Sequence, residues 1–429
     1  MFKVIVSAAA LLLWSGCSMH TPVTPQEKAF DAEDTYALFA LDAEARGEYA
    51  TAAQYYALLY EKVPRIAYRD HFFENLLRAK QFDDVLKNAE TIQQPEAFDV
   101  QVERYRIRAL IGKRDFKTAE TAALALLKQT KAKPEYVSLA EIYALQKEYD
   151  SALRYLESAY DIDYDEALLD SMAVMMYVNL DRKKDAIALL ETHIRMNGCS
   201  ERICRRLVGF YSEQDNVEGM LTTYLRLYDV RPSKEVAEAI VRIYSYQNDL
   251  VHLKQFLEAH HSDDALLLKL YVNAKEYAAA SALAEKLYQD SGDAVYLGQS
   301  AIFAFEGAKD KKDPKLIAEV IEKLKRAVQS EKDPLMLNYL GYILIDENVN
   351  PKAGIVYVKA ALEQEPDSPY YLDSLAWGYY KLGRCKEADA VMKKVLKAMH
   401  GEKDEELEAH IKAIGECLKN SDKKEQGKQ

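Results

Sequence analysis

Hydrophobic positions along this chain fall into short segments separated by polar turns, and the segments come in pairs from about residue 34 to the C-terminus. In one clear pair, the apolar run from Leu139 to Tyr143 is followed, after a polar turn, by Tyr149, Ala152 and Leu156. Small and aromatic side chains in such a pair lie where two antiparallel helices must approach closely. The pattern therefore predicts an all-α fold built from helical hairpins.

The hairpins recur about every 34 residues. The positions that pack the first helix of each pair are Ala43, Leu76, Leu110, Tyr143, Tyr177, Tyr211, Tyr244, Tyr271, Ala301, Leu344 and Tyr379. Most steps are 33 to 35 residues, but the three steps between Tyr244 and Leu344 are 27, 30 and 43. One hairpin cannot bury its apolar face alone, whereas a stack can. We therefore predict a solenoid of about eleven hairpins over residues 34–400, with a break between two sub-arrays near residues 255–315.

Eight to ten residues after nearly all of these positions stands the residue where the second helix crosses the first. It is often small, as at Ala52, Ala119, Ala152, Ala186 and Ala388. This alternation resembles the tetratricopeptide repeat family over nearly the whole chain after its N-terminal segment. The resemblance implies a right-handed superhelical solenoid whose first helices line a concave groove. Residues 401–420 are predicted to form a capping helix and residues 421–429 a charged tail.

The N-terminus has the pattern of a targeting segment. Lys3 is followed by an apolar stretch that is too short to span a bilayer and by the run Trp14-Ser15-Gly16-Cys17. The segment resembles a bacterial lipoprotein signal, which implies that residues 1–16 are removed and that Cys17 is acylated, with residues 17–33 as a tether. Ser18 after the cysteine resembles an outer-membrane sorting pattern. The expected location is therefore the outer membrane, facing the periplasm; the alternative is an ordinary secretory signal with an incidental Cys17.

Export would leave four cysteines in an oxidising compartment, where three pairings are possible. Cys199 lies in a predicted loop and Cys204 in the first turn of the next helix, so this pair is within local reach. Cys385 opens the last second helix, and Cys417 lies beside it if the terminal helix doubles back. We therefore favour Cys199–Cys204 and Cys385–Cys417. A four-cysteine zinc site is the alternative, but it lacks the usual CxxC spacing.

Repeats ten and eleven carry more information than the period alone. Their first helices contain Asn338-Tyr339-Leu340-Gly341-Tyr342 and, from Tyr371 to Gly383, the sequence YLDSLAWGYYKLG. These details resemble a group of proteobacterial envelope lipoproteins with about eleven tetratricopeptide repeats, which includes the adaptor of the periplasmic carboxyl-terminal processing protease. The implied groove places six side chains along one stretch, namely Asn338, Tyr342, Asp373, Trp377, Tyr380 and Lys381. These would suit an extended peptide. Alternatively, Tyr342 and Trp377 pack between neighbouring helices.

Composition and motifs argue against other classes of function. The formal net charge of -12 disfavours nonspecific nucleic-acid binding, which needs a basic face. We find no catalytic motif and expect no cofactor. We also expect no metal site, because the nearest candidate ligands, His260 and His261, are adjacent and point to different sides of a helix. The sequence predicts a non-enzymatic protein-binding scaffold, such as a protease adaptor. The alternatives are an assembly factor for a secretin, pilus or outer-membrane protein, and a regulator of peptidoglycan synthesis or an unrecognised hydrolase.

Overall fold

The computed structural model of the chain describes residues 29–93, 98–399 and 405–426. The predicted signal peptide, Cys17 and most of the tether therefore lie outside the described residues. No helix in the described part of the chain is long and apolar enough to cross a membrane.

The chain divides into two compact units, Met1–Asn216 and Val217–Gln429. The described helices of the first unit are α1 (Glu33–Ala45), α2 (Tyr49–Lys62), α3 (Ile66–Arg78), α4 (Phe82–Ile92), α5 (Val100–Gly112), α6 (Phe116–Thr130), α7 (Lys133–Leu145), α8 (Tyr149–Asp163), α9 (Glu166–Val174), the π-helical turn η1 (Met175–Asn179), α10 (Lys183–Asn197) and α11 (Glu201–Glu213). Those of the second unit are α12 (Val217–Val230), α13 (Lys234–Tyr246), α14 (Leu250–His260), α15 (Asp264–Asn273), α16 (Tyr277–Ser291), α17 (Ala294–Glu306), α18 (Pro314–Ser330), α19 (Pro334–Asp346), α20 (Pro351–Gln364), α21 (Pro369–Lys381), α22 (Cys385–Ala398) and α23 (Glu405–Gln426).

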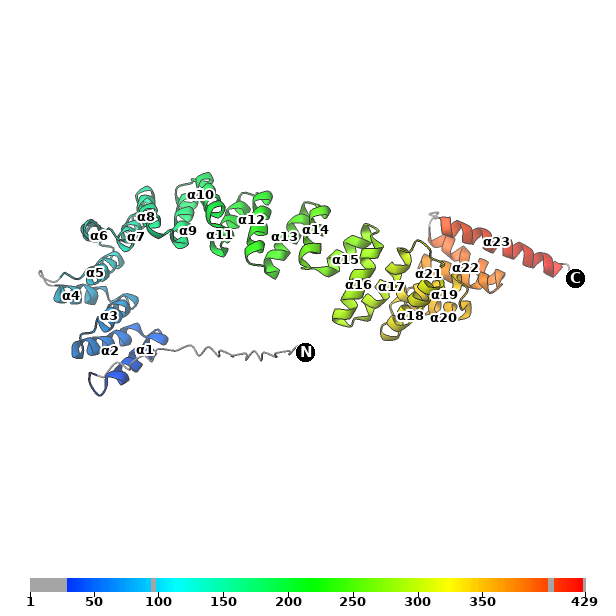
Figure 1. Cartoon of the computed structure of the whole chain (residues 1–429), viewed down its shortest axis with the longest axis horizontal. Coiled ribbons are helices and arrows are strands. Elements are labelled where there is room, and N and C mark those ends of the chain that lie inside the picture. Colours follow the sequence, from blue (N-terminus) through cyan, green and yellow to red (C-terminus); the bar gives the residue numbers. More distant parts are fainter. Residues whose placement is uncertain (1–28, 94–97, 400–404, 427–429) are drawn as a thin grey trace, which may run out of the picture. The chain divides into compact units, whose positions relative to one another are not determined.

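Within each unit, consecutive helices pack as hairpins, and each hairpin packs against the next (Figure 1). The described residues contain no β-strand, so the predicted all-α repeat fold is confirmed. The first unit comprises five hairpins and α11, and the second comprises α12, five hairpins and α23. The units divide between the two helices of the predicted sixth repeat. The break predicted near residues 255–315 stays a prediction, although the short α14 and α15 account for the 27-residue step.

The period of the sequence has a local structural cause at the end of each first helix. At Gly47 the backbone enters the left-handed region, with φ of 76°, and the Glu48 N–H then donates to the Ala43 carbonyl at 2.8 Å. This arrangement is a Schellman C-cap. The same bond recurs at the carbonyls of Leu76, Leu110, Tyr143, Tyr211, Tyr244, Tyr271 and Tyr379. Eight of the eleven positions that mark the repeat in the sequence are therefore the acceptors of the bond that ends a first helix.

The turn after the first helix of repeat ten is one residue longer than in the regular repeats. The Leu344 carbonyl accepts from the Asn350 N–H at 3.0 Å, one residue later than in the regular repeats. The crossing positions are packed as expected, because Ala52, Ala152 and Ala388 are fully buried.

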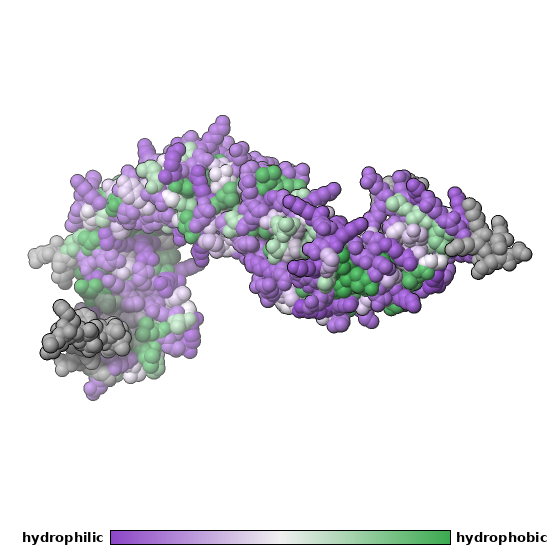
Figure 2. Space-filling model, turned by 45° about the vertical axis from the view of Figure 1, so that its right-hand side comes forward, coloured by the Kyte–Doolittle hydropathy of each residue, from purple (hydrophilic) through white to green (hydrophobic). Residues whose placement is uncertain are grey.

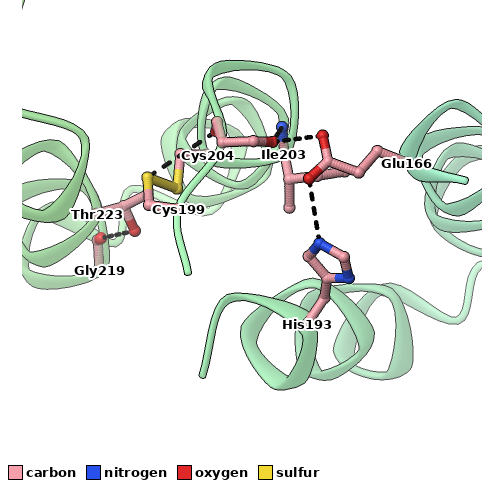
Figure 3. Close-up of a disulfide and its surroundings, with 8 residues drawn as sticks. Glu166, His193, Cys199, Ile203, Cys204, Gly219 and Thr223 are labelled. Carbon is pink, nitrogen blue, oxygen red and sulfur yellow. Dashed lines mark hydrogen bonds and ion pairs between the residues drawn. A yellow bond between two sulfur atoms is a disulfide. The ribbon is translucent and has the colours of Figure 1, made fainter. Parts of the chain in front are cut away.

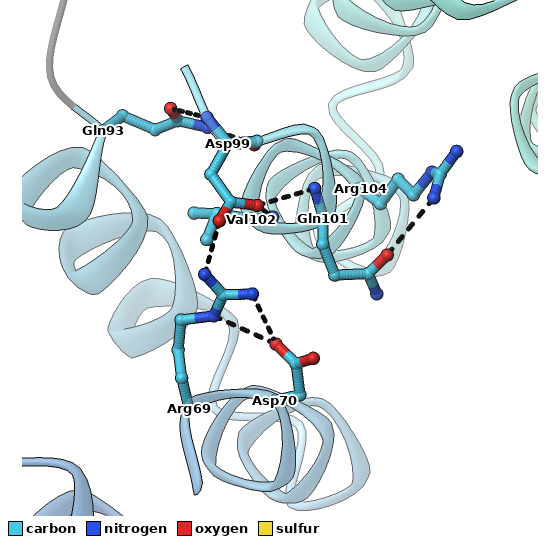
Figure 4. A network of polar contacts seen from close by, with 7 residues as sticks. All are labelled: Arg69, Asp70, Gln93, Asp99, Gln101, Val102 and Arg104. Atoms are coloured by element: carbon cyan, nitrogen blue, oxygen red, sulfur yellow. Dashed lines mark hydrogen bonds and ion pairs between the residues drawn. The ribbon is translucent and has the colours of Figure 1, made fainter. Parts of the chain in front are cut away.

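Polar side chains link neighbouring repeats at the N-terminus of α5 (Figure 4). Asp99 caps this helix by accepting from the backbone N–H groups of Gln101, at 2.8 Å, and Val102, at 3.1 Å. The buried Arg69 of α3 pairs with Asp99 and with Asp70. Partial burial would raise the pKa of Asp99, but the Val102 N–H and the Arg69 guanidinium outweigh it and hold this pKa below its usual value.

Replacing Asp99 by asparagine is expected to lower the free energy of unfolding of this region by about 1–2 kcal/mol at neutral pH, because Arg69 loses a charged partner. The folded-state pKa of Asp99 is lowered, so its contribution is complete above about pH 4 and is lost as the pH falls through the folded pKa. Thermal unfolding of both proteins across this range measures the difference. Glu157→Gln, at an exposed position of α8, is the control, and an Asp99→Asn penalty that persisted unchanged in acid would contradict the interpretation.

The structure contains two disulfides among the described residues, Cys199–Cys204 and Cys385–Cys417. Cys199–Cys204 ties the loop after α10 to the first turn of α11, where the Ser200 hydroxyl accepts from the Ile203 N–H at 3.3 Å (Figure 3). The same hydroxyl donates to Glu166 of α9 at 2.7 Å. Cys385–Cys417 joins α22 to α23, so the terminal helix does double back over the last hairpin. That helix runs to Gln426, past the predicted end of the cap at residue 420.

Candidate functional site

A cavity of about 1060 Å³ lies in the second unit, among the first helices of repeats nine to eleven. Phe305 and Glu306 of α17 and Asn338 and Tyr342 of α19 line it. The turn from Glu365 to Ser368 and the start of α21 also contribute to the lining. Glu406 and Leu407 of α23 complete the lining, so the terminal helix is a wall of the cavity as well as a cap.

Most of the lining residues belong to first helices, where residues three or four positions apart share the face that borders the cavity. Leu335, Asn338, Tyr342 and Asp346 are three or four residues apart on α19 and therefore share one face of that helix. The opposite face of α19 packs into the core between α18 and α20, where Leu337, Leu340 and Leu344 are buried.

Acidic and aromatic side chains dominate the cavity. Two lysines, Lys311 and Lys312, line it, against seven carboxylates, namely Glu306, Asp346, Glu347, Glu365, Asp367, Asp373 and Glu406. The aromatic residues of the lining are Phe305, Tyr339, Tyr342, Tyr370 and Tyr371. At the opening, Tyr370 is 66% exposed and Leu335 is 48% exposed. The face of the molecule in Figure 2 is mostly hydrophilic, with its hydrophobic residues in separate patches.

Tyrosine hydroxyls donate hydrogen bonds to carboxylates of this cavity. Tyr339 donates to Glu306 at 3.2 Å, and Tyr342 donates to Glu406. Burial, together with the hydrogen bond to Glu406 and the charge of Asp346, raises the pKa of Tyr342. Burial and the charge of Glu365 raise the pKa of Tyr371 to about 12. These hydroxyls therefore remain protonated donors at neutral pH.

Three of the six side chains predicted to contact a partner line the cavity. They are Asn338, Tyr342 and Asp373. Asn338 is only 9% exposed, and its Oδ1 atom has no hydrogen-bond partner among the described residues. Asp373 accepts from the ring nitrogen Nδ1 of His410 at 2.9 Å.

The other three, Trp377, Tyr380 and Lys381, lie outside the cavity lining and form a stack with α23. The Trp377 ring stacks on Tyr380, with centroids 4.6 Å apart, and on His410, with centroids 3.9 Å apart. Its indole N–H donates to Asp346 at 2.8 Å, and Lys381 pairs with the same carboxylate at 3.3 Å. Both Trp377 and Tyr342 therefore make contacts between helices, as the alternative interpretation anticipated. Whether any of the six side chains binds a partner stays a prediction.

Several residues of the cavity were not predicted from the sequence. Tyr370 stands at the first turn of α21, one turn before Asp373, and the helical period could have indicated it. Glu406 and His410 could not be found in this way, because α23 lies outside the repeat and its docking site is set by tertiary contacts.

The histidines near residue 260 have ordinary structural contacts. His261 Nδ1 lies 2.8 Å from Asp264 Oδ1, and Asp263 caps α15 through the Leu266 N–H at 2.9 Å. The His260 ring packs against Phe256 and Tyr228. No group of His, Cys, Asp and Glu side chains in the described part of the chain could hold a metal ion.

Comparison with known proteins supports the class of fold. Residues 136–169, which span α7 and α8, match the tetratricopeptide repeat family. No curated protein sequence matches the chain. With the hairpins of both units, this match makes the protein a tetratricopeptide-type helical scaffold, a fold that is typically non-catalytic and suited to binding other proteins.

The solved structures that this chain matches share little sequence with it. The APC/C hetero-tetramer Cut9–Hcn1 is 12% identical over 92% of this chain and 91% of that one, with a TM-score of 0.38. A tetratricopeptide repeat protein from Parabacteroides merdae is 14% identical over 58% of this chain and 99% of its own, with a TM-score of 0.25. The Naa15/Naa10 complex bound to HypK-THB is 10% identical over 87% of this chain and 64% of that one, with a TM-score of 0.28.

Proposed function

We propose that this protein is a lipid-anchored adaptor of the bacterial envelope that binds extended protein segments and presents them to a carboxyl-terminal processing protease. The observation that carries the binding role is the cavity of about 1060 Å³ on the first helices of repeats nine to eleven. Its volume is at the upper end of the roughly 300–1,000 Å³ of ordinary ligand pockets, and its aromatic side chains offer large contact areas at low entropic cost. The envelope role is supported by the resemblance of the N-terminal segment to a bacterial lipoprotein signal. The protease role is supported by the resemblance of the first helices of repeats ten and eleven to those of the envelope lipoproteins that include the protease adaptor.

Anchoring is tested at Cys17. Cys17→Ser is expected to release the protein from membranes into the soluble periplasmic fraction, because acyl chains on this residue would supply the anchor. Fractionation and mass spectrometry of the N-terminus measure the release and the modification. The double variant Cys199→Ser with Cys204→Ser is the control, because it removes the disulfide between these two cysteines without touching the leader. Continued tight membrane association of Cys17→Ser would exclude lipid anchoring at this residue.

Partner binding is tested by purifying the full protein from envelopes of the source bacterium. Tyr370→Ala removes an exposed aromatic side chain at the cavity opening and is expected to reduce recovery of a carboxyl-terminal processing protease or its substrates. Tyr246→Ala is the control, because Tyr246 of α13 is 81% exposed and lies outside the cavity lining. Recovery of secretin, pilus or outer-membrane proteins instead would favour an assembly factor. Peptide or peptidoglycan cleavage by the purified protein alone would overturn the adaptor.

A further inference from the structure

The lining of the cavity in the second unit is rich in carboxylates, and this charge indicates which kind of protein segment it would bind. Of its seven carboxylates, those of Glu347, Glu365, Asp367 and Glu406 form no ion pair among the described residues. Lys311 pairs with Glu306 at 2.8 Å, and Lys381, from outside the lining, pairs with Asp346. Lys312, which also lines the cavity, forms no ion pair among the described residues, so four unpaired carboxylates stand against one unpaired lysine. The remaining charge of the described lining is therefore negative, and like charges gathered in a concave site attract a cation.

The protein itself shows how this part of the fold holds an ammonium group. Lys311 Nζ lies 5.0 Å from the centroid of the Phe305 ring while it pairs with Glu306. Lys381 Nζ lies 5.0 Å from the Trp377 centroid while it pairs with Asp346. Each lysine thus sits between an aromatic face and a carboxylate, a combination that stabilises cations.

The same combination recurs inside the cavity without a basic partner among the described residues. Tyr342 is hydrogen-bonded to Glu406, and Tyr371 lies beside Glu365. Neither carboxylate is paired with a lysine, arginine or histidine of the described residues.

Asn338 provides an independent indication of a ligand. Its side chain lines the cavity and is only 9% exposed. Its Oδ1 atom accepts no hydrogen bond from the described residues. A buried acceptor without a partner costs about 1–3 kcal/mol, so a donor supplied by a ligand would recover this cost. An ammonium, guanidinium or backbone N–H group can supply that donor.

We propose that the cavity formed by α17, α19, α21 and α23 binds a segment of a protein chain that carries lysine or arginine, with the cationic side chain directed toward the carboxylates. This inference rests on the proposed binding of extended segments and adds the chemistry of the bound segment. Apolar neighbours of the basic residue would contact Leu335 and Tyr370 at the opening. An acidic segment would be repelled.

The test uses the full chain in detergent and three pools of fluorescent peptides of about ten residues, a length that suits an extended segment. The pools share a mixture of Ala, Ser, Leu and Tyr and differ in a central pair that is Lys-Lys, Gln-Gln or Glu-Glu. At roughly 0.15 M salt, where distant charges are screened, fluorescence anisotropy is expected to show about tenfold tighter binding of the Lys pool than of the Gln pool. The Glu pool is expected to bind weakest.

Two matched double variants separate the cavity from the overall charge of the protein. Glu347→Gln with Asp367→Asn removes two unpaired carboxylates from the cavity and is expected to weaken the Lys pool about three- to tenfold while sparing the Gln pool. Glu322→Gln with Glu363→Gln makes the same change of net charge at exposed sites outside the lining, and should alter neither. Asn338→Ala should weaken both pools.

The outcomes distinguish this inference from the proposed function. If the wild type bound the Lys and Gln pools equally and Tyr370→Ala lost both, the proposal that the cavity binds extended segments would stand. The preference for cationic segments would be overturned. Equal weakening by the two double variants would assign the effect to net charge and also overturn it. Spermidine that displaced the Lys pool more effectively than an unlabelled peptide of equal charge would identify a small polycation in place of a protein segment. Absence of binding by all three pools would reject the cavity as a site for basic segments, while the envelope purification would still test the adaptor.

Discussion

Gly341→Ala is expected to unfold repeats ten and eleven at denaturant concentrations that leave the rest of the protein folded. A Cβ atom on Gly341 would lie 2.5 Å from Val358 Cγ2 and 2.8 Å from the Gly354 carbonyl oxygen. The facing position is equally tight, because a Cβ atom on Gly354 would lie 2.6 Å from the Gly341 carbonyl oxygen. The backbones of α19 and α20 are therefore in direct contact and cannot accommodate a methyl group without moving apart.

The cost of this separation is expected to be about 3 kcal/mol, at the upper end for overpacked cores, because backbone atoms cannot rotate away as side chains do. In a stack of repeats the loss stays with the nearest neighbours, so α19 to α23 should open first. Hydrogen exchange of these helices and denaturant unfolding followed by circular dichroism measure the effect.

Gly415→Ala is the matched control in the same unit. Gly415 lies within α23, and an added Cβ atom there would meet nothing within 4 Å. Alanine is favoured over glycine in a helix by about 1 kcal/mol, so this variant should be as stable as the wild type or slightly more stable. A Gly341→Ala protein within about 0.5 kcal/mol of the wild type would show that the two helices are not in close contact.

Trp377→Ala is expected to release α23 from the last hairpin. The substitution removes the stacks on Tyr380 and His410 and the hydrogen bond from the indole to Asp346. Removal of a large packed aromatic side chain typically costs about 3–5 kcal/mol. Because Trp377 is only half-buried, the lower end of that range is expected. Amide protection in α23 should fall more than protection in α13 to α16.

The disulfide between Cys385 and Cys417 limits this release, because it keeps α23 near α22. Cys417→Ser combined with Trp377→Ala should therefore expose α23 further than either change alone. Trp377→Phe retains an aromatic stack but loses the hydrogen bond, and should give an intermediate result. Tyr246→Ala, at an exposed site of α13, is the control. Unchanged protection of α23 in Trp377→Ala would show that the stack does not hold this helix.

Loss of α23 would also change the cavity, because Glu406 and Leu407 form part of its lining. Trp377→Ala should therefore weaken peptide binding indirectly, although the indole lies outside the cavity. Comparing its peptide affinity with that of Tyr370→Ala separates the two effects. Only Trp377→Ala should lower the protection of α23, whereas both variants should lower peptide affinity.

The sequence by itself determined the hairpins and their order along the chain. This was possible because each hairpin is a local structure. In most repeats its first helix ends at a C-cap between residues close in the chain, such as Ala43 and Glu48. The helical period likewise placed Asn338 and Tyr342 on one face of a single helix, and both line the cavity. The spacing of the cysteines indicated the same two pairs that the structure joins.

Only the tertiary structure decided how the terminal helix completes the site. Glu406 and His410 contact Tyr342 and Asp373, which lie 64 and 37 residues earlier in the chain. No period relates these residues, because α23 is not a repeat and docks through side chains particular to the last two hairpins. That docking stacks His410 on the half-buried Trp377, which thereby supports the helix that forms part of the cavity wall. The uncompensated negative charge of the cavity also emerges only when carboxylates from several helices and from the turns after α19 and α20 converge, because each is an ordinary acidic residue in its own segment.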